Sequence, residues 1–316
     1  MLENIKREII ELVDSKILMN ESLIKHTTFG VGGNASIFAY PNNKSDLKKL
    51  LKYSYKNKIK TFFIGSGSNL LVSDNGFNGL VICLQKTFKE FILNKNLEAS
   101  IGSGVMLGNV VRVLSKEAIK GLESLIGVPG TLGGALVMNA GAYGREISNY
   151  LVNITVLNLS GEEKIYKKED LKFSYRYSSI PNEEIIVEAK FKFEKGNISN
   201  IKNRKKEVSK KRKENQPLKF RSAGSIFKNP SFDVAAGYLI DQTNLKGTRV
   251  GDAEISTKHA NFIVNHGKAS SSDILELIKI AKSKVREKFN INLDLEIKLL
   301  GFNNHELEGI AWFIII

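Results

Sequence analysis

Two glycine-rich stretches are the first residues whose type and spacing could do chemistry. Residues 62–79 run from a short apolar strand straight into GSGSN at 65–69. Successive backbone N–H groups in such a turn can form a nest for a pyrophosphate. Residues 121–145 hold seven glycines and one proline in an otherwise apolar run, which predicts a buried backbone surface against a large ligand. Either stretch alone would be an ordinary turn between strands, but the pair favours a ligand site.

The sequence lacks the motifs of several common sites. The run GSGSNL at 65–70 does not satisfy the dinucleotide fingerprint, and no Walker lysine with a Ser or Thr follows it. The four histidines show no metal-ligand spacing, and a single cysteine leaves no pair for zinc or an iron–sulfur cluster. No GxSxG elbow occurs. Rossmann, P-loop, metalloenzyme and hydrolase interpretations therefore lose their usual support.

Three polar residues stand in unusual settings. Ser225 lies in AGSIFKNP, with a glycine before it and a cation, an amide and a proline after it, and its ordinary interpretation is a turn serine. Arg176 lies between aromatic residues in FSYRYS, where it could cover a tyrosine at the surface or, in a pocket, hold a substrate carboxylate with its planar fork. Glu296 lies in the alternating run LDLEIKL, where composition alone predicts a solvent-facing strand residue.

Composition indicates a globular protein of two or three domains. The chain has 316 residues, of which 42% are hydrophobic and 25% charged. Cys83, in the apolar run LVICL, can form no disulfide within one chain, which favours a reducing, cytoplasmic compartment. Residues 1–18 have the apolar spacing of an amphipathic helix and contain acids, unlike a signal peptide. The apolar run at 309–316 is too short to span a bilayer.

The charge balance points to an anionic partner. The formal net charge is +14, and the isoelectric point is near 9.5. Nucleic acid, a membrane surface and a phosphorylated small molecule would all fit such a charge. Much of the excess lies in residues 201–215, which we interpret as one helix with a solvated basic face. Nucleic-acid binding is the second interpretation, because aromatic residues are not interleaved with the cations.

The elements that would position these residues mix helices and strands, so we expect an α+β protein. The predicted helices cover 43–58, beginning at Asn43 or Ser45, then 201–215, 233–247 and 270–290, the last with its cap near Ser272 or Asp273. The strand KTFFIGSG carries the first glycine loop. NITVLNL and EKIYKK, joined at Ser160-Gly161, predict a hairpin. Two further strands are expected at 259–266 and 294–301.

Seven motifs together carry a resemblance to a known family. HTTFGVGGNA, GSGSNLL, GVPGTLGGALVMNAGAYG, FSYRYS, AGSIFKNP, AAGYLID and LEIKLLG occur in this order between about residue 20 and residue 301. Together they resemble the UDP-N-acetylenolpyruvoylglucosamine reductases, flavoenzymes of bacterial peptidoglycan synthesis and hence of cell-wall biogenesis, cell shape and cell division. After AGSIFKNP the chain reaches AAGYLID within a few residues, so it resembles the shorter type, which lacks an insertion with a substrate-binding tyrosine.

The resemblance implies a fold and an activity. The expected fold is the FAD-binding PCMH or vanillyl-alcohol-oxidase type, with a smaller α+β C-terminal substrate domain. Residues 1–61 and 62–195 would be the two FAD-binding subdomains, 196–301 the substrate domain, and 302–316 a tail whose role stays open. Family members pass a hydride from NADPH to noncovalently bound FAD and then reduce the enolpyruvyl ether of the UDP-sugar to a D-lactyl ether, which makes UDP-N-acetylmuramate.

The resemblance also implies site residues. Arg176 would bind the enolate that develops at the substrate carboxylate, Glu296 would assist by hydrogen bonding or proton relay, and Ser225 would protonate the second carbon. The implied FAD-binding residues are Gly65, Ser66, Gly67, Ser68, Asn69, Leu70, Gly130, Thr131, Gly133, Gly134, Asn139, Gly141 and Ala142. Lys228 and Asn229 are the implied substrate-binding residues, and no metal is expected.

Two other functions compete with this interpretation. A related FAD oxidase would pass electrons to oxygen, although the serine motif and Glu296 argue against it. A basic nucleic-acid-binding protein would explain the charge, and tight, salt-sensitive DNA binding without flavin would support it. With the reductase interpretation we expect a cytoplasmic monomer that binds NADPH and a UDP-sugar, binds no nucleic acid and does not insert into a membrane.

Overall fold

The computed structural model describes residues 2–310, and the chain divides into two compact units. Of the described residues, unit 1 contains 2–19, Ser36–Ser66 and Gly79–Lys211. Unit 2 contains Asn20–Ala35, Gly67–Asn78 and 212–310. Each unit therefore gathers segments that are far apart in sequence, and each is described by itself.

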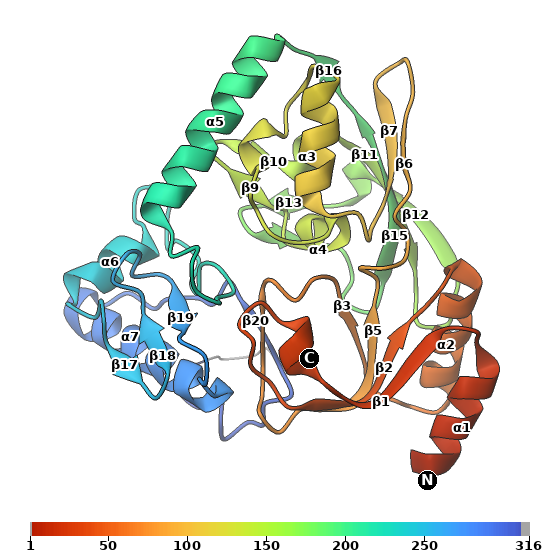
Figure 1. Cartoon of the computed structure of the whole chain (residues 1–316), viewed down its shortest axis with the longest axis horizontal. Helices are drawn as coiled ribbons and strands as arrows, with labels where there is room; N and C mark the ends of the chain where they lie inside the picture. Colours follow the sequence, from red (N-terminus) through yellow and green to blue (C-terminus); the bar gives the residue numbers. More distant parts are fainter. Residues whose placement is uncertain (1, 311–316) are drawn as a thin grey trace. The chain divides into compact units, whose positions relative to one another are not determined.

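Unit 1 begins with a four-stranded sheet flanked by two helices (Figure 1). The elements are α1 (Leu2–Leu12), β1 (Lys16–Ser22), β2 (Asn34–Tyr40), α2 (Lys44–Lys56), β3 (Thr61–Ile64) and β5 (Phe77–Cys83), and the strand order is β1-β2-β5-β3. Strands β3 and β5 pair in parallel. Helix α2 begins where predicted, because the Asn43 side chain accepts a hydrogen bond from the Asp46 backbone N–H at 2.9 Å.

Unit 1 also contains a five-stranded sheet in which neighbouring strands are antiparallel. It has the order β12-β11-β15-β7-β6 and comprises β6 (Phe91–Leu93), β7 (Glu98–Gly102), β11 (Leu151–Leu157), β12 (Glu163–Lys167) and β15 (Ile185–Lys192). The predicted hairpin is confirmed as β11 and β12. Gly161 in its turn has φ +78°, a left-handed conformation that glycine adopts without steric cost.

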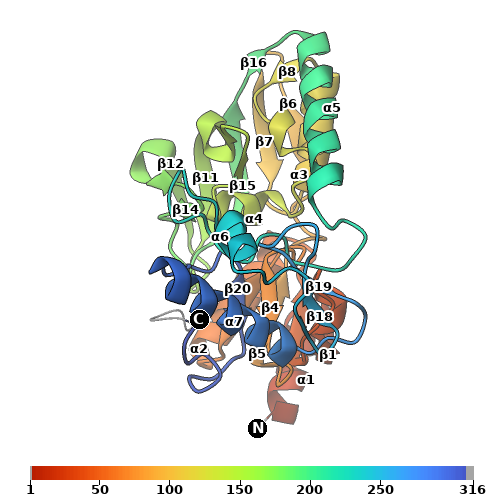
Figure 2. The same ribbon diagram turned by 90° about the vertical axis from the view of Figure 1, so that its left-hand side faces the viewer.

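Several helices and short strands complete unit 1. They are α3 (Leu107–Lys116), β8 (Ile119–Lys120), η2 (Glu123–Leu125), α4 (Leu132–Val137), β9 (Gly141–Ala142), β10 (Arg145–Glu146), η3 (Ile147–Tyr150), η4 (Lys168–Asp170), β13 (Phe173–Ser174), β14 (Tyr177–Ser178), β16 (Glu194–Lys195) and α5 (Ile198–Asn215). Helix α3 lies beside β7 in two perpendicular views (Figures 1 and 2). Helix α5 is the predicted basic helix, and of its residues only Ile201 and Val208 are buried.

Two hydrophobic clusters hold unit 1 together. One packs α3 and α4 against the five-stranded sheet and includes Val110, Leu136 and Phe191. The other packs α1 and α2 against the four-stranded sheet and also takes in Leu157 and Val187 from the five-stranded sheet. Because β11 and β15 contribute to this second cluster, the two sheets of unit 1 share apolar contacts.

Unit 2 is built around helix α7. Its elements are η1 (Leu23–His26), β4 (Leu70–Val72), α6 (Ala236–Gln242), β17 (Arg249–Val250), β18 (Ala253–Ile255), β19 (Ile263–Asn265), α7 (Ser271–Phe289) and β20 (Lys298–Leu300). Strands β17, β18 and β19 form an antiparallel sheet beside α7 (Figure 1), and β4 pairs with β20 in parallel (Figure 2). The cap of α7 is Ser270, which forms a capping box with Asp273.

Several predicted elements are shorter in the structure than in the prediction. Strand β19 covers only Ile263–Asn265 of the predicted 259–266. The first helix ends at Leu12, and strand β1 follows it. Helix α6 covers Ala236–Gln242 and not 233–247, because Asn244 adopts a left-handed φ of +60° that a helix cannot continue through. Strand β20 covers only Lys298–Leu300 of the predicted 294–301. No helix within residues 2–310 is long and apolar enough to cross a lipid bilayer.

Candidate active site

The predicted site residues are distributed over both units. Unit 1 contains Gly65, Ser66, Gly130, Thr131, Gly133, Gly134, Asn139, Gly141, Ala142 and Arg176, and unit 2 contains Gly67, Ser68, Asn69, Leu70, Ser225, Lys228, Asn229 and Glu296. The residues within each unit can therefore be compared with one another directly.

In unit 1, the two glycine-rich stretches meet at Gly65 and Thr131. A Cβ atom on Gly65 would lie 2.4 Å from the Thr131 Oγ1 atom, which is closer than real Cβ contacts. Only glycine therefore fits at the end of strand β3. The buried Thr131 side chain caps α4, where its Oγ1 accepts a long hydrogen bond of 3.5 Å from the Gly134 N–H. Folding thus brings the two stretches into contact, although they are far apart in sequence.

The second glycine stretch lies against the loop that follows β7. The Gly133 N–H donates to the Ser103 carbonyl at 2.9 Å, and the Leu132 N–H donates to the Val105 carbonyl at 2.8 Å. A Cβ atom on Gly133 would lie 3.1 Å from the Ser103 Cβ atom, so this contact is tight as well. The stretch is consequently a fixed backbone surface and not a flexible loop.

Asn139 connects this stretch to the turn that carries Arg176. Its side-chain amide donates to the Glu146 carboxylate at 2.8 Å and to the Ser174 carbonyl at 3.0 Å. Asn139 is fully buried and has φ +42°. Strands β13 and β14 form a small hairpin whose turn contains Arg176 at φ +54°. The Arg176 guanidinium carbon lies 4.9 Å from the centre of the Tyr175 ring, a cation–π distance.

The residues of unit 1 fit the FAD that the sequence predicts. Ser103 and Glu146 take the space of a Cβ atom at Gly133 and Gly141, so the polar atoms of this surface carry the fit. Two buried side-chain oxygens, Asn139 Oδ1 and Ser103 Oγ, have no hydrogen-bond partner within the described residues. Buried polar atoms are normally paired, so these two are available to a ligand.

In unit 2, the loop at 67–70 packs on the first motif of the chain. A Cβ atom on Gly67, which has φ +62°, would lie 1.9 Å from the His26 carbonyl oxygen. The Thr28 N–H donates to the Gly67 carbonyl at 3.1 Å. The motifs HTTFGVGGNA and GSGSNLL are therefore in direct contact, although about forty residues separate them.

Ser225 lies in an extended segment that Asn261 fixes. The Asn261 side chain accepts from the Phe227 N–H at 2.9 Å and donates to the Phe227 carbonyl at 2.8 Å. Its backbone carbonyl accepts from the Ile226 N–H at 2.9 Å, and Ser225 forms an isolated bridge with Phe262. Asn261 was not predicted as a site residue, although an asparagine within the apolar run HANFIVNH is the signal that could have revealed it.

The backbone of Glu296 runs beside the Ser225 segment. Its N–H donates to the Ile226 carbonyl at 2.8 Å, and its carbonyl accepts from the Asn69 side-chain amide at 3.0 Å. Glu296 lies just before β20 and not within a long strand, because these two partners take up its backbone groups. The structure thus brings together three predicted residues, Ser225, Glu296 and Asn69.

Two lysines add positive charge near this segment. The Lys228 N–H donates to the Asp294 carbonyl at 2.8 Å, and the Lys298 N–H donates to the Asn69 carbonyl at 2.9 Å. Burial, together with the charge of Lys228, lowers the pKa of Lys298. Lys298 was not predicted as a site residue. Asn229 has a structural contact, since its Oδ1 atom accepts from the Ala236 N–H at the start of α6 at 3.1 Å.

Other reactive residue types lie in ordinary surroundings. The His26 ring pairs with Glu21 at 2.9 Å. Cys83 is buried, as predicted, and burial raises the pKa of its thiol. Within residues 2–310, no three His, Cys, Asp or Glu side chains are grouped so that they could hold a metal ion.

Comparison with known proteins gives the class first. Residues 35–165 match a family model described as an FAD binding domain, and this range covers both sheets of unit 1 in part. The chain therefore contains an FAD-binding domain. Residues 216–300, in unit 2, match a second model, described as the C-terminal domain of UDP-N-acetylenolpyruvoylglucosamine reductase.

Whole-chain relatives give the family. A UDP-N-acetylenolpyruvoylglucosamine reductase of Clostridium novyi is 41% identical over 300 residues, which are 94% of this chain and 97% of the relative. One from Clostridium tetani is 43% identical over 291 residues, 92% of this chain and 94% of the relative. The crystal structure of the Thermus caldophilus enzyme superposes with a TM-score of 0.77 at 35% identity, covering 91% and 99% of the two chains. The chain belongs to the UDP-N-acetylenolpyruvoylglucosamine reductase family.

Proposed function

We infer that this chain reduces UDP-N-acetyl-enolpyruvoylglucosamine to UDP-N-acetylmuramate, with NADPH as the hydride donor and FAD as the bound cofactor. The observation that carries this inference is identity of 41% to a named reductase over 94% of the chain. The matches to an FAD binding domain in unit 1 and to the reductase C-terminal domain in unit 2 support this inference. The reaction would provide a precursor for peptidoglycan.

FAD, when bound, supplies the two-electron chemistry that accepts a hydride from NADPH and donates it to the substrate. We propose that the glycine stretches hold it. In unit 1 the residues are Gly65, Ser66, Gly130, Thr131, Gly133, Gly134, Asn139, Gly141 and Ala142; in unit 2 they are Gly67, Ser68, Asn69 and Leu70. The close contact of Gly65 with Thr131 and the unpartnered Asn139 Oδ1 atom support this assignment.

Arg176 is the proposed stabiliser of negative charge. When a hydride adds to the methylene carbon of the enolpyruvyl group, charge moves toward the carboxylate as an enolate. A guanidinium fork held at that carboxylate would stabilise the enolate, and one such group contributes on the order of 3 kcal/mol. The tight hairpin turn at Arg176 and its support by Asn139 favour a fixed position for this side chain.

Ser225 is the proposed proton donor, and Glu296 its assistant. A proton delivered to the second carbon completes the saturated D-lactyl ether, so one hydride and one proton are added overall. A serine hydroxyl is a weak acid, which means that its contribution depends on placement. The backbone contact between Glu296 and Ile226, the neighbour of Ser225, supports a shared role.

Lys228 and Asn229 are the proposed substrate-binding residues. The UDP group brings a pyrophosphate, and two lysines in unit 2, Lys228 and Lys298, are near enough for Lys228 to lower the pKa of Lys298. An anionic ligand would relieve this repulsion. The Asn229 Oδ1 atom already accepts from the Ala236 N–H at the start of α6, which leaves its side-chain NH2 group for the substrate.

We propose further that the protein is a cytoplasmic monomer that binds no nucleic acid. The lone, buried Cys83 supports a reducing compartment. Sedimentation of the purified protein at the mass of one 35.2 kDa chain would support the monomer, and a dimer mass would exclude it. If the protein bound duplex DNA with an affinity that falls steeply as salt is added, the proposal that it binds no nucleic acid would be contradicted.

The proposed function is tested by product analysis. The purified chain is supplied with FAD, NADPH deuterated at the transferred position and UDP-N-acetyl-enolpyruvoylglucosamine, and the product is examined by mass spectrometry. The expected product is UDP-N-acetylmuramate that carries one deuterium on the methyl group. NADPH consumption without formation of the lactyl ether would contradict the proposed acceptor.

A further inference from the structure

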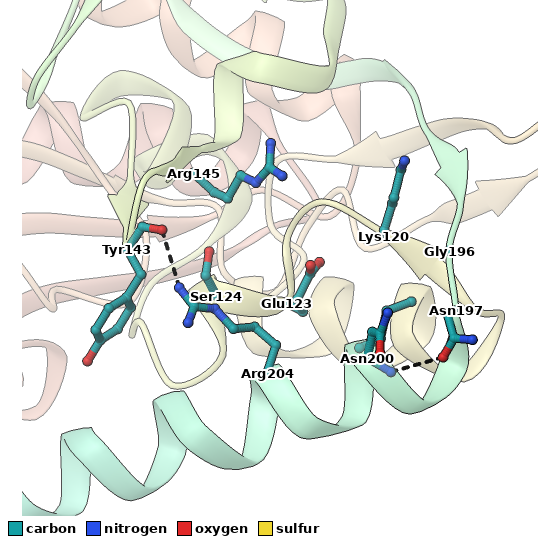
Figure 3. A pocket seen from close by; sticks show the side chains of 10 residues that line it. Lys120, Glu123, Ser124, Tyr143, Arg145, Gly196, Asn197, Asn200 and Arg204 are labelled. Carbon is teal, nitrogen blue, oxygen red and sulfur yellow. Dashed lines mark hydrogen bonds between the residues drawn. The ribbon is translucent and has the colours of Figure 1, made fainter.

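A cavity of about 400 Å³ lies in unit 1, lined by none of the residues assigned above. Its lining consists of Lys120, Glu123, Ser124, Tyr143, Arg145, Gly196, Asn197, Asn200, Ile201 and Arg204. These residues come from β8, from η2, from the turn between β9 and β10 and the start of β10, from the segment between β16 and α5, and from the first half of α5 (Figure 3). The volume falls within the range of small-molecule sites.

Three cations line this cavity, and they differ in how they are paired. Arg145 makes no side-chain hydrogen bond or ion pair within the described part of the chain. Lys120 pairs with Glu194 at 2.8 Å, and Arg204 pairs with Glu207 at 2.9 Å. Both pairs are exposed, with side-chain exposures of 36% to 67%, and exposed pairs contribute little because water screens them. An anion with two charges could therefore compete for these cations.

The Ser124 hydroxyl supplies an independent observation. Ser124 is 2% exposed, and its Oγ atom has no hydrogen-bond partner within the described residues. Figure 3 shows the side chain pointing from the segment after Gly121 toward Arg145, with Arg204 of α5 beside it. Buried hydroxyls are normally paired. The neighbouring cations would attract a phosphate, and one of its oxygens could accept a hydrogen bond from the Ser124 hydroxyl.

The remaining lining suits a polar group attached to such an anion. The Glu123 carboxylate accepts from the Gly121 N–H at 2.5 Å and can accept further hydrogen bonds. Tyr143 is 45% exposed, and its ring centre lies 5.5 Å from the Arg204 guanidinium carbon. The Arg204 Nη2 atom donates a long hydrogen bond of 3.5 Å to the Tyr143 carbonyl. Hydroxyl groups of a sugar would find acceptors here, while the tyrosine offers an aromatic face.

We propose that this cavity binds a phosphorylated, hydroxyl-bearing small molecule, with its phosphate between Arg145, Arg204 and the Ser124 hydroxyl. The site goes beyond the reductase reaction, because it uses none of the residues proposed for FAD, for the UDP-sugar or for catalysis. The shared chemistry is a phosphomonoester on a sugar, which a nucleotide and a sugar phosphate both carry. The aromatic face of Tyr143 distinguishes the two sources.

Calorimetric titration of the FAD-saturated full-length protein tests the proposal. The probes are inorganic phosphate, AMP and glucose 1-phosphate. The double variant Arg145→Gln/Arg204→Gln should bind each phosphate at least about tenfold more weakly, because two charge-assisted contacts are lost. Ser124→Ala should weaken binding about threefold or more. The variant Lys167→Gln/Lys190→Gln removes the same charge from exposed positions in unit 1 and should bind as the parent does.

The affinities for AMP and for glucose 1-phosphate show which kind of ligand the cavity binds. If AMP binds more tightly and this preference is lost in Tyr143→Ala, the ligand is a nucleotide. If the two bind equally, the ligand is a sugar phosphate. Unchanged phosphate affinity in the double variant would overturn the proposal, and so would phosphate binding that is lost in Lys228→Gln. Reductase turnover of the double variant should stay within about threefold of the parent. Parallel loss of turnover and phosphate binding would make the cavity part of the active site and overturn a separate ligand.

Discussion

The side-chain amide of Asn139 donates a hydrogen bond to the backbone carbonyl of Ser174, at 3.0 Å, two residues before Arg176. This bond joins the glycine stretch of unit 1 to the hairpin that carries the proposed charge-stabilising arginine. The Ser178 hydroxyl makes a second link, donating to the Val137 carbonyl at 2.8 Å. The proposed FAD-binding backbone and the hairpin of Arg176 are therefore joined by two hydrogen bonds.

Asn139→Gly should lower both stability and turnover. Glycine accepts the left-handed φ at this position, so the variant removes the side-chain hydrogen bonds without adding backbone strain. We expect the free energy of unfolding to be about 1–3 kcal/mol lower than in the parent. We expect kcat to fall about tenfold to hundredfold, because the hairpin that carries Arg176 loses its hydrogen bond to Asn139. Denaturant unfolding and steady-state kinetics measure the two effects.

Asn139→Ala adds a control for backbone strain. It should be about 1 kcal/mol less stable again, because alanine pays for a positive φ that glycine does not. Turnover at the parent level in Asn139→Gly would show that the Ser174 contact does not position Arg176.

Gly65→Ala should destabilise unit 1 and weaken FAD binding. The added Cβ atom would lie 2.4 Å from Thr131 Oγ1, and overpacking of this kind costs about 1–3 kcal/mol. Removing the hydroxyl in Thr131→Ala should recover part of the loss in the double variant, because the two sites are in contact. Melting temperature and flavin titration measure the effects.

A matched control separates crowding from the substitution itself. Gly108→Ala, in helix α3, meets only the Arg112 guanidinium at 3.9 Å and should be neutral or stabilising. Additive losses in Gly65→Ala/Thr131→Ala would contradict direct contact between the two glycine stretches.

Ser225→Ala should separate the two half-reactions. Reduction of the flavin by NADPH should stay near the parent rate, while reoxidation by the UDP-sugar should slow by about 10²–10⁴-fold. Stopped-flow absorbance resolves both steps. Ser222→Ala, in the same segment, should change neither by more than about threefold. Equal slowing of both steps in Ser225→Ala would exclude a specific role as proton donor.

His259 should make the protein less stable in acid. Burial lowers the pKa of His259 below its ordinary value, so the unfolded chain takes up the proton at a higher pH than the folded chain. The contribution of neutral His259 to the free energy of unfolding is complete above about pH 6.5. It is lost as the pH falls toward the pKa of His259 in the folded protein. The ring Nδ1 atom also accepts from the Asn261 N–H at 3.2 Å, and protonation would remove this acceptor.

The test compares unfolding at about pH 7.5 and about pH 5.5. The loss of unfolding free energy on acidification should be smaller in His259→Gln than in the parent. His305→Gln alters an exposed histidine and should keep the parent's pH dependence. An unchanged pH dependence in His259→Gln would show that another group dominates acid destabilisation.

Local patterns in the sequence predicted much of the fold. The cap of α2 at Asn43 and the turn at Gly161 were readable because each depends on residues close in sequence. The capping box of α7 begins at Ser270, two positions before the predicted cap, since three successive serines offer equivalent caps. The early end of α6 at Gln242 had a signal in Asn244, an amino acid that tolerates a left-handed φ.

Contacts between distant segments explain what the sequence could not predict. No local pattern places Thr131 against Gly65, or Asn261 on both backbone groups of Phe227. The short β20 depends on pairing with β4, more than two hundred residues earlier in the chain. The motif resemblance predicted Ser225, Arg176 and Glu296 as site residues without these contacts, and their catalytic roles stay predictions.

The most direct test of the reductase assignment follows the flavin absorption band without oxygen. The FAD-loaded protein is reduced with one equivalent of NADPH, and UDP-N-acetyl-enolpyruvoylglucosamine is then added. We predict that the oxidised-flavin band bleaches with NADPH and returns on addition of the UDP-sugar. A bleached band that returns only when oxygen is admitted would contradict the reductase assignment and favour an oxidase.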